Sequence, residues 1–181
     1  MVLTEHDADL FYELFLPLLN YVNRTYRISG RLKTIARGKR MDQLELHAVA
    51  VFLWDNPNII DEYLRMHNNL PDEHTELIRS WKRHVTGRFI LERNLKAGSI
   101  FISMDNSQVY QVSGIIDSFE EMFSFQPLPI ILSATLIPFR DVIITDGLIM
   151  TYSVHLGGGI RKMLKETYMA AKKNGNIHRT L

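Results

Sequence analysis

The chain contains no cysteine among its 181 residues. Disulfides, thiolate metal sites and cysteine nucleophiles are therefore excluded, and a reducing cytoplasm is the expected compartment. No apolar run approaches the roughly 20 residues that a bilayer crossing needs, and the longest, residues 48–54, has the length of a buried helix segment. The opening residues MVLTEHDADLFYELF are acidic where a secretory signal requires positive charge, so no export is expected.

The chain also has almost no net charge. Its 21 Lys and Arg residues and 20 Asp and Glu residues leave a formal charge of +1, so the whole molecule has no general attraction for polyanions. With 46% hydrophobic and 23% charged residues, the composition is that of a folded globular protein rather than a disordered one. A chain of this length fits one domain, or one core with an attached lobe.

Helical patterns fill the first half of the chain. Apolar residues recur at helical spacing, and capping residues such as Thr4, Asp42 and Asn56 precede them. Pro17 lies inside the first pattern, so a break or a kink is expected near Leu16. About four helices are predicted, at residues 4–26, 42–55, 57–67 and 71–87.

After Gly87 the pattern changes to short β-branched and aromatic runs that turn signals separate. Asp146 and Gly147 form the strongest hairpin signal, although a bulge within one long strand is an alternative interpretation. A short helical turn is expected within residues 117–123, and Gly175 is expected to end a C-terminal helix that follows a triple glycine. Strands are predicted at residues 89–92, 99–104, 109–115, 130–138, 142–145 and 148–154.

The predicted elements follow the order of an α+β fold, with helices first, then strands and then a closing helix. We expect a helical lobe at residues 1–86, packed through one shared core on the second part of the chain, residues 87–181. That part is predicted to be a small bent antiparallel sheet or partial barrel of five to six strands with a C-terminal helix. The strand number and the helix after the third strand resemble those of the oligonucleotide-binding fold. This analogy is topological only, and a fold does not by itself imply a function.

Several segments resemble a family of uncharacterised bacterial proteins related to the SEC-C motif-associated proteins. The segments are NPNIIDEYL, LIRSWKRHVTGRFILERNLKAGSIFI, VYQVSGIIDSFEEM, ATLIPFRDVIITDGL and LGGGIRKMLKETYMAAKKNGNI. The resemblance covers residues 42–181 in the same order. It implies no activity and no catalytic residues, and because this chain has no cysteine, the zinc-dependent role of the SEC-C motif does not apply to it.

The triple glycine that precedes the C-terminal helix is a candidate anion site. A glycine-rich turn that opens a helix presents backbone N–H groups and a partial positive charge, which suit phosphate or carboxylate. The spacing matches neither a dinucleotide fingerprint nor a P-loop. The competing interpretation is a tight turn that lets the strand and the helix pack closely. The candidate residues are Gly157, Gly158, Gly159, Arg161 and Lys162.

Two basic segments, residues 24–40 and 79–88, suggest a nucleic-acid surface. The first holds seven Lys and Arg residues and no acidic residue, and Phe101 and Tyr110 are candidate stacking residues. The competing interpretation is a solvated connection between helices. Binding to nucleic acid would weaken steeply with salt. The candidate residues are Arg24, Arg27, Arg31, Lys33, Arg37, Lys39, Arg40, Arg79, Lys82 and Arg83.

The sequence offers little support for a catalytic site or a metal site. Asp141, Asp146 and His155 lie near predicted strand ends and offer an acid and a base, but aspartates of this kind are more often turn residues that bond their own backbone. The seven histidines show no paired ligand spacing, so no metal and no cofactor are expected. An anion-dependent enzyme at the junction of residues 141–162 is the weakest functional hypothesis.

The leading hypothesis is a non-enzymatic cytoplasmic binding module. Its partner would be another protein or a second copy of the chain, bound at an edge strand or on the first helix. Nucleic acid is the alternative partner, and a membrane is not expected.

Overall fold

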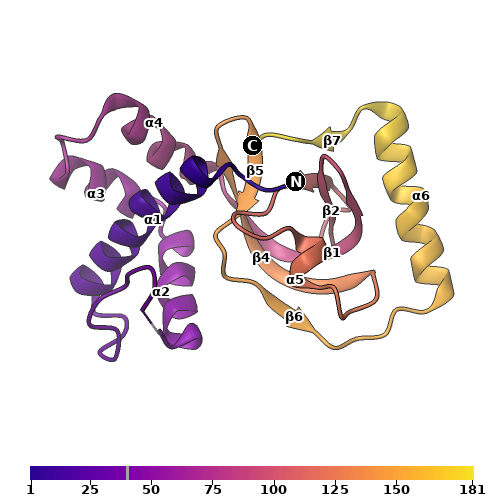
Figure 1. Ribbon diagram of the computed structural model, residues 1–181, viewed down its shortest axis with the longest axis horizontal. Coiled ribbons are helices and arrows are strands. Elements are labelled where there is room, and N and C mark those ends of the chain that lie inside the picture. The colour runs from indigo at the N-terminus through magenta and orange to yellow at the C-terminus, as the bar shows by residue number, and fades with distance from the viewer. Residues whose placement is uncertain (40) are drawn as a thin grey trace. The chain divides into compact units, whose positions relative to one another are not determined.

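The computed structural model describes residues 1–39 and 41–181, which form two compact units (Figure 1). The helical unit comprises residues 5–82. The sheet unit comprises residues 1–4 and 83–181. The helices and the mixed sheet confirm the predicted α+β class, whereas the core shared between the two parts stays a prediction.

The helical unit contains four α-helices, as predicted. Asp42 caps α2 as expected, because its side chain accepts hydrogen bonds from the backbone N–H groups of Leu44 and Glu45. The helices are α1 (Glu5–Tyr26), α2 (Gln43–Asp55), α3 (Ile59–Met66) and α4 (Asp72–Ser80), followed by the 3-10 turn η1 (Trp81–Arg83).

The sequence predicts a break or a kink near Leu16. The break is wrong, because α1 is one continuous helix of 22 residues, and the kink stays a prediction. Pro17 cannot donate to the carbonyl of Glu13, but both residues lie on the exposed side of α1, where water can satisfy that carbonyl. The fourth helix also ends earlier than its predicted limit of Gly87. Val85 and Gly87 instead pair with residues of a strand in the sheet unit, and this tertiary pairing outweighs the local helical pattern.

Aromatic side chains fill the core of the helical unit. Phe11 stacks on Phe15 at 5.1 Å, and Phe15 stacks on Trp54 at 5.9 Å. The ring of Trp81 meets Phe15 edge-on at 5.7 Å, and all four side chains are buried. Because such rings bury large areas in well-defined geometries, they fix how η1 and α2 pack on α1.

Tyr26, at the end of α1, donates a hydrogen bond of 2.6 Å to Glu62 in α3. That bond is the main reason that the pKa of Tyr26 rises from 10.0 to about 12. Because the folded-state pKa is raised, the stability that the bond contributes is complete below pH 10.0 and is lost as the pH rises through about 12. The difference in unfolding free energy between wild type and Tyr26→Phe should therefore shrink over this interval. Urea denaturation at the two ends of the interval measures it, and a difference independent of pH would contradict the assignment.

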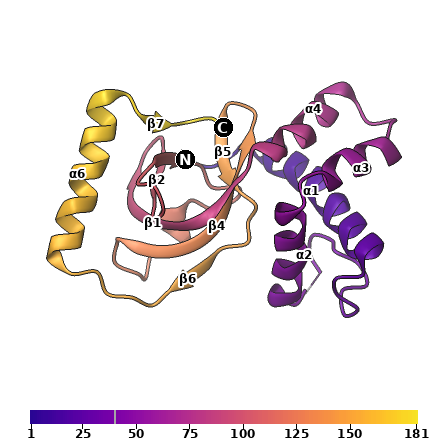
Figure 2. The same cartoon turned by 180° about the vertical axis from the view of Figure 1, so that it is seen from behind.

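The sheet unit is built on a ring of paired strands (Figure 2). The pairing order is β1-β2-β3-β5-β4, and β4 pairs with β1 again to close the ring. A short helix, α5 (Phe119–Met122), lies between β3 and β4 in the chain. The ring strands are β1 (Val85–Leu95), β2 (Gly98–Ser103), β3 (Val109–Val112), β4 (Ile130–Phe139) and β5 (Val142–Thr145).

The sheet unit contains three further elements outside this ring. They are β6 (Met150–Tyr152), the helix α6 (Gly158–Asn174) and β7 (Ile177–His178). The sheet is mixed and not wholly antiparallel as predicted, because β3 runs parallel to both β5 and β7. The connection from β3 to β4 passes over the position that β5 later occupies. Because β4 then returns to β5 through an antiparallel turn, β5 lies parallel to β3.

The hairpin predicted at Asp146 and Gly147 is also wrong. In the described residues β5 and β6 both pair with β4, on the same side of it, instead of with each other. Residues 136–139 of β4 pair with β5, and residues 131–133 pair with β6. Gly147 has a φ of +81°, which lets the chain turn between the two pairings. The alternative of a bulge within one long strand is closer to what the structure shows, because β5 and β6 both run antiparallel to β4.

The sheet unit has two apolar clusters, one on each face of the curved sheet. Side chains such as Phe89, Phe101 and Leu132 pack with Phe119 of α5 inside the ring. On the outer face, residues of β1–β4 pack under α6. Because neighbouring residues of a strand point to opposite faces, β2 is buried on both sides along its whole length.

Candidate functional site

The triple glycine lies at the start of α6, as predicted, and all three residues are exposed. A Cβ atom added at Gly157, Gly158 or Gly159 would meet nothing within 4 Å. Close packing of strand and helix therefore does not explain these glycines. Arg161 turns back and donates from Nε to the carbonyl of Leu156 at 2.9 Å, while the exposed Lys162 lies 3.9 Å from Glu166. The five candidate residues thus lie together, with Arg161 already bonded.

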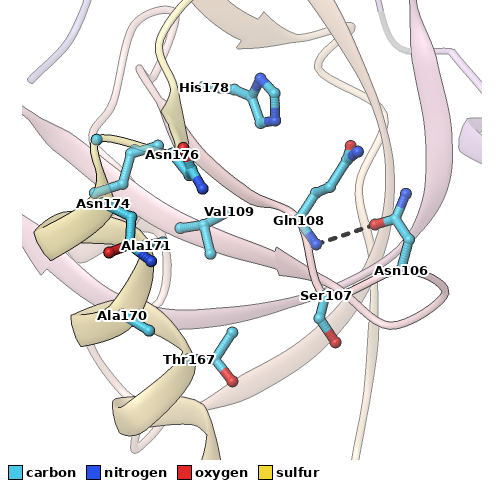
Figure 3. Close-up of a pocket in the computed structure, with 12 residues that line it drawn as sticks. Asn106, Ser107, Gln108, Val109, Thr167, Ala170, Ala171, Asn174, Asn176 and His178 are labelled. Atoms are coloured by element: carbon cyan, nitrogen blue, oxygen red, sulfur yellow. Dashed lines mark hydrogen bonds between the residues drawn. The ribbon is translucent and has the colours of Figure 1, made fainter.

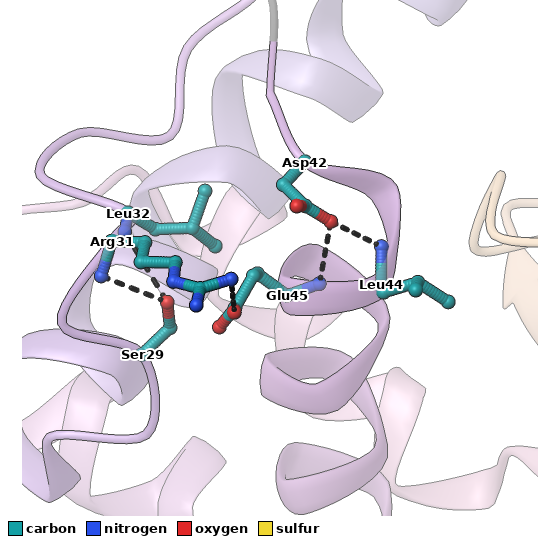
Figure 4. A network of polar contacts seen from close by, with 6 residues as sticks. All are labelled: Ser29, Arg31, Leu32, Asp42, Leu44 and Glu45. Atoms are coloured by element: carbon teal, nitrogen blue, oxygen red, sulfur yellow. Dashed lines mark hydrogen bonds and ion pairs between the residues drawn. The ribbon is translucent and has the colours of Figure 1, made fainter.

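Four of the ten candidate basic residues pair with carboxylates of the helical unit. Arg31 lies 3.4 Å from Glu45 (Figure 4). Arg37 pairs with Asp9, and its guanidinium lies 5.2 Å from the centre of the Tyr12 ring. The hydrogen bond that Arg37 donates to Asp9 is the main reason that the pKa of Arg37 is raised. The other two pairs are Arg79 with Glu76 and Lys82 with Asp61.

The remaining basic candidates are exposed where the structure describes them. Their exposed positions would let these cations meet a polyanion at the surface. They are Arg24, Arg27, Lys33, Lys39 and Arg83, whereas Arg40 lies outside the described residues.

Two asparagines of α1 fasten the basic segment to that helix. Asn23 donates to the carbonyls of Ser29 and Leu32 at 3.1 and 2.8 Å, and its Oδ1 accepts from the N–H of Ser29 at 2.7 Å. Asn20 holds the backbone of Ile35 through its own amide in the same way. The segment is therefore not simply a solvated connection, because its backbone is bonded along α1.

Figure 4 shows how Ser29 completes this arrangement. Its Oγ accepts hydrogen bonds from the N–H groups of Arg31 and Leu32, each at 3.2 Å. Backbone donors that a phosphate-binding loop would present to its ligand are therefore bonded inside the segment.

Phe101 and Tyr110 do not occupy positions from which they could stack on a base. Phe101 is fully buried inside the ring and Tyr110 is 2% exposed. The outer face of β2 and β3 lies under α6, so α6 covers the face that oligonucleotide-binding folds use for ligands. Burial also raises the pKa of Tyr110.

The three candidate catalytic residues have separate surroundings. Asp141 is exposed in the turn between β4 and β5, and His155 is exposed in the segment before α6. Asp146 is buried, and its Oδ1 accepts a hydrogen bond of 3.0 Å from the N–H of Leu148. Asp146 therefore serves as a turn residue, the competing interpretation of its sequence. Across residues 1–39 and 41–181, no group of three His, Asp or Glu residues could hold a metal ion.

The strand β6 presents an open edge of the sheet. It ends the pairing order, and its three residues are exposed. The surrounding residues 147–160 contain no Lys, Arg, Asp or Glu. Met150 is 42% exposed, Tyr152 is 43% exposed and Val154 is 54% exposed. The phenol of Tyr152 lies 2.8 Å from the hydroxyl of Ser133, which fixes its ring against β4.

A groove of about 670 Å³ lies between the C-terminal end of α6, β7 and the turn that joins β2 to β3 (Figure 3). Asn106, Ser107 and Gln108 of that turn form one wall, and Asn174 and Asn176 form another. In the sequence, residues 106–108 read only as part of a turn between two predicted strands. The available signal was the amide-rich, uncharged composition of both segments.

Comparison with known proteins gives no assignment, because no family model, curated protein or solved structure matches the chain. None of the helices in the described residues combines the length and the apolar character that a bilayer crossing requires.

Proposed function

We propose that the chain is a non-enzymatic binding module of the cytoplasm that takes an extended protein segment on the outer edge of β6. The observation that carries this proposal is the exposure of all three β6 residues at the end of the pairing order. An exposed strand edge offers backbone N–H and C=O groups that a second strand can satisfy.

The chemistry of the edge favours an apolar partner. Proteins usually protect an exposed edge with lysine, proline or inward-pointing charge, and residues 147–160 contain none of these. Met150 and Tyr152 alternate with Thr151, so they lie on the same face of the strand. The expected partner is an extended segment with apolar side chains at alternate positions.

A random peptide library displayed on phage tests this proposal. Peptides selected on the full chain should show alternating apolar residues, and fluorescence anisotropy should give saturable binding. Substituting Met150→Lys and Val154→Lys together should weaken that binding by about tenfold or more, because lysines along an edge strand disfavour its pairing with a further apolar strand.

The matched control is Ile116→Lys with Met122→Lys. These side chains are 52% and 43% exposed but lie on the connection around α5. The proposal fails if no peptide is enriched, or if both double variants bind equally. Sedimentation velocity identifies a second copy as the occupant if wild type dimerises and the β6 variant does not.

Nucleic-acid binding and an anion-dependent enzyme stay predictions of the sequence. No contact in the described residues favours either of them over the edge of β6.

A further inference from the structure

The groove at the end of α6 carries no formal charge. None of its twelve lining residues is Asp, Glu, Lys or Arg, although these types make up 23% of the chain. A charged ligand would lose water there without gaining a partner of opposite charge. The carbonyl end of α6 also lies at the groove, and its partial negative charge disfavours anions. The groove is therefore suited to a neutral ligand.

The polar groups of the groove are available for binding. The side chains of Ser107, Asn174 and Asn176 form no hydrogen bond within the described residues. Asn106 accepts one bond, from the N–H of Gln108, which leaves its NH₂ group available. Gln108 is less available, because its Oε1 accepts from the phenol of Tyr110, which lies on the face of β3 opposite to Val109. Each amide combines donors with an acceptor, which matches a ligand whose groups both donate and accept, as hydroxyls do.

The floor of the groove is small and apolar. Ala170 and Ala171 line it from α6, and Val109 and Ile177 line it from β3 and β7. The two strand residues lie opposite each other in the parallel pairing. This floor lets a ring approach the helix closely, with Asn174 and Asn176 at the end of α6 and Asn106 on the turn between β2 and β3 (Figure 3). A pyranose presents the matching surfaces, since its C–H groups are apolar and its edge carries hydroxyls.

His178 stands at one end of the groove. Its ring stacks on Tyr110 with centroids 5.1 Å apart and an interplanar angle of 28°. The hydroxyl of Tyr110 is in turn fixed by Gln108. Tyr110 belongs to the cluster inside the ring, whereas Val109 and Ile177 belong to the cluster under α6, so the imidazole is directed to the opposite face of β3 and β7 from the floor of the groove. The ligand assignment therefore does not depend on this imidazole.

We propose that this groove binds a short neutral saccharide. The proposal does not depend on β6, because the groove is formed by other segments of the sheet unit. An extended peptide fits the groove less well, because it needs donors and acceptors at strand spacing, and the edge of β6 supplies those.

Nuclear magnetic resonance of the ¹⁵N-labelled full chain tests the proposal. The neutral probes are maltose, cellobiose, lactose and N,N′-diacetylchitobiose, with glucose and glucose 6-phosphate as a matched neutral and anionic pair. At least one neutral probe should shift the side-chain amide signals of Asn174 and Asn176 saturably. Glucose 6-phosphate should bind no more tightly than glucose, because the groove offers its phosphate no cation.

Two variants locate the binding. Ala170→Trp places an indole in the groove from an exposed position and should abolish the shifts. Asn174→Asp with Asn176→Asp keeps side-chain size but adds charge, and should weaken binding by about tenfold or more. Asn69→Asp, at an exposed asparagine of the helical unit, should change nothing.

Three results would overturn the proposal. The first is that no neutral probe shifts these signals. The second is that Ala170→Trp binds as wild type does. The third is that the shifts map to Gly157–Gly159 and follow the phosphate, which would place an anion site at the other end of α6. Peptides selected on β6 should leave the groove signals unchanged, so failure of one proposal is distinguishable from failure of the other.

Discussion

Gly114→Ala is expected to destabilise the sheet unit by about 3 kcal/mol or more, at the upper end of the range for overpacked sites. A Cβ atom at this position would lie 2.0 Å from the carbonyl oxygen of Asp117 and 3.2 Å from the Cα of Ser118. Both neighbours are backbone atoms, so no side chain can rotate away and the connection before α5 must move.

That movement would also disturb the N-terminus of the chain. The carbonyl of Gly114 accepts from the N–H of Leu3 at 3.0 Å, and its N–H donates to the carbonyl of Met1 at 3.1 Å. These bonds hold residues 1–3 in the sheet unit through a parallel bridge between Val2 and Gly114. Loss of the bonds would add to the cost of the misplaced backbone.

Gly159→Ala is the matched control for this prediction. Gly159 lies in the first turn of α6, and an added methyl group would meet nothing within 4 Å. Alanine should stabilise the helix there by about 0.5–1 kcal/mol. Both tryptophans, Trp54 and Trp81, lie in the helical unit, so amide hydrogen exchange in β2 and β3 is the suitable measurement. Equal protection in the two variants would contradict the packing argument.

The helices were predictable because their signals are local. The Asp42 cap and the apolar spacing along α1 each lie within one element, so composition and order were enough to place them. The α+β order followed from the same patterns. The parallel pairing of β3 with β5 was not predictable, because β4 separates these two strands in the chain. Nothing in the local sequence indicates that β5 lies between β3 and β4 in the sheet.

Prediction of the candidate site was likewise limited to what lies close together in the sequence. The triple glycine was found from sequence because its residues are consecutive. The walls of the groove come from residues 106–108 and 174–178, which only the pairing of β3 with β7 and the packing of α6 bring together. Likewise, the basic segment gave no sign that Asp9, Glu45 and Asn23 would hold it.

Asn23→Ala is expected to destabilise the helical unit by about 3 kcal/mol, because buried polar groups without partners each cost about 1–3 kcal/mol. Asn23 is 6% exposed, and its amide satisfies three backbone groups of Ser29 and Leu32. Without it, residues 28–37 should separate from α1. Urea denaturation followed by tryptophan fluorescence measures the loss, and faster hydrogen exchange in residues 28–37 should accompany it.

Two further variants separate the hydrogen bonds from the change in size. Asn56→Ala removes one exposed bond of 2.9 Å to the carbonyl of Phe52, and should cost about 1 kcal/mol or less. Asn23→Asp keeps the size and the acceptor for the N–H of Ser29, but turns an acceptor toward the carbonyls of Ser29 and Leu32. It should therefore destabilise the unit at least as much as alanine does. If Asn23→Asp were as stable as wild type, the hydrogen bonds that Asn23 donates would not be what holds the segment on α1. The ion pairs of Arg31 and Arg37 would then be the contacts that position the cations of the segment.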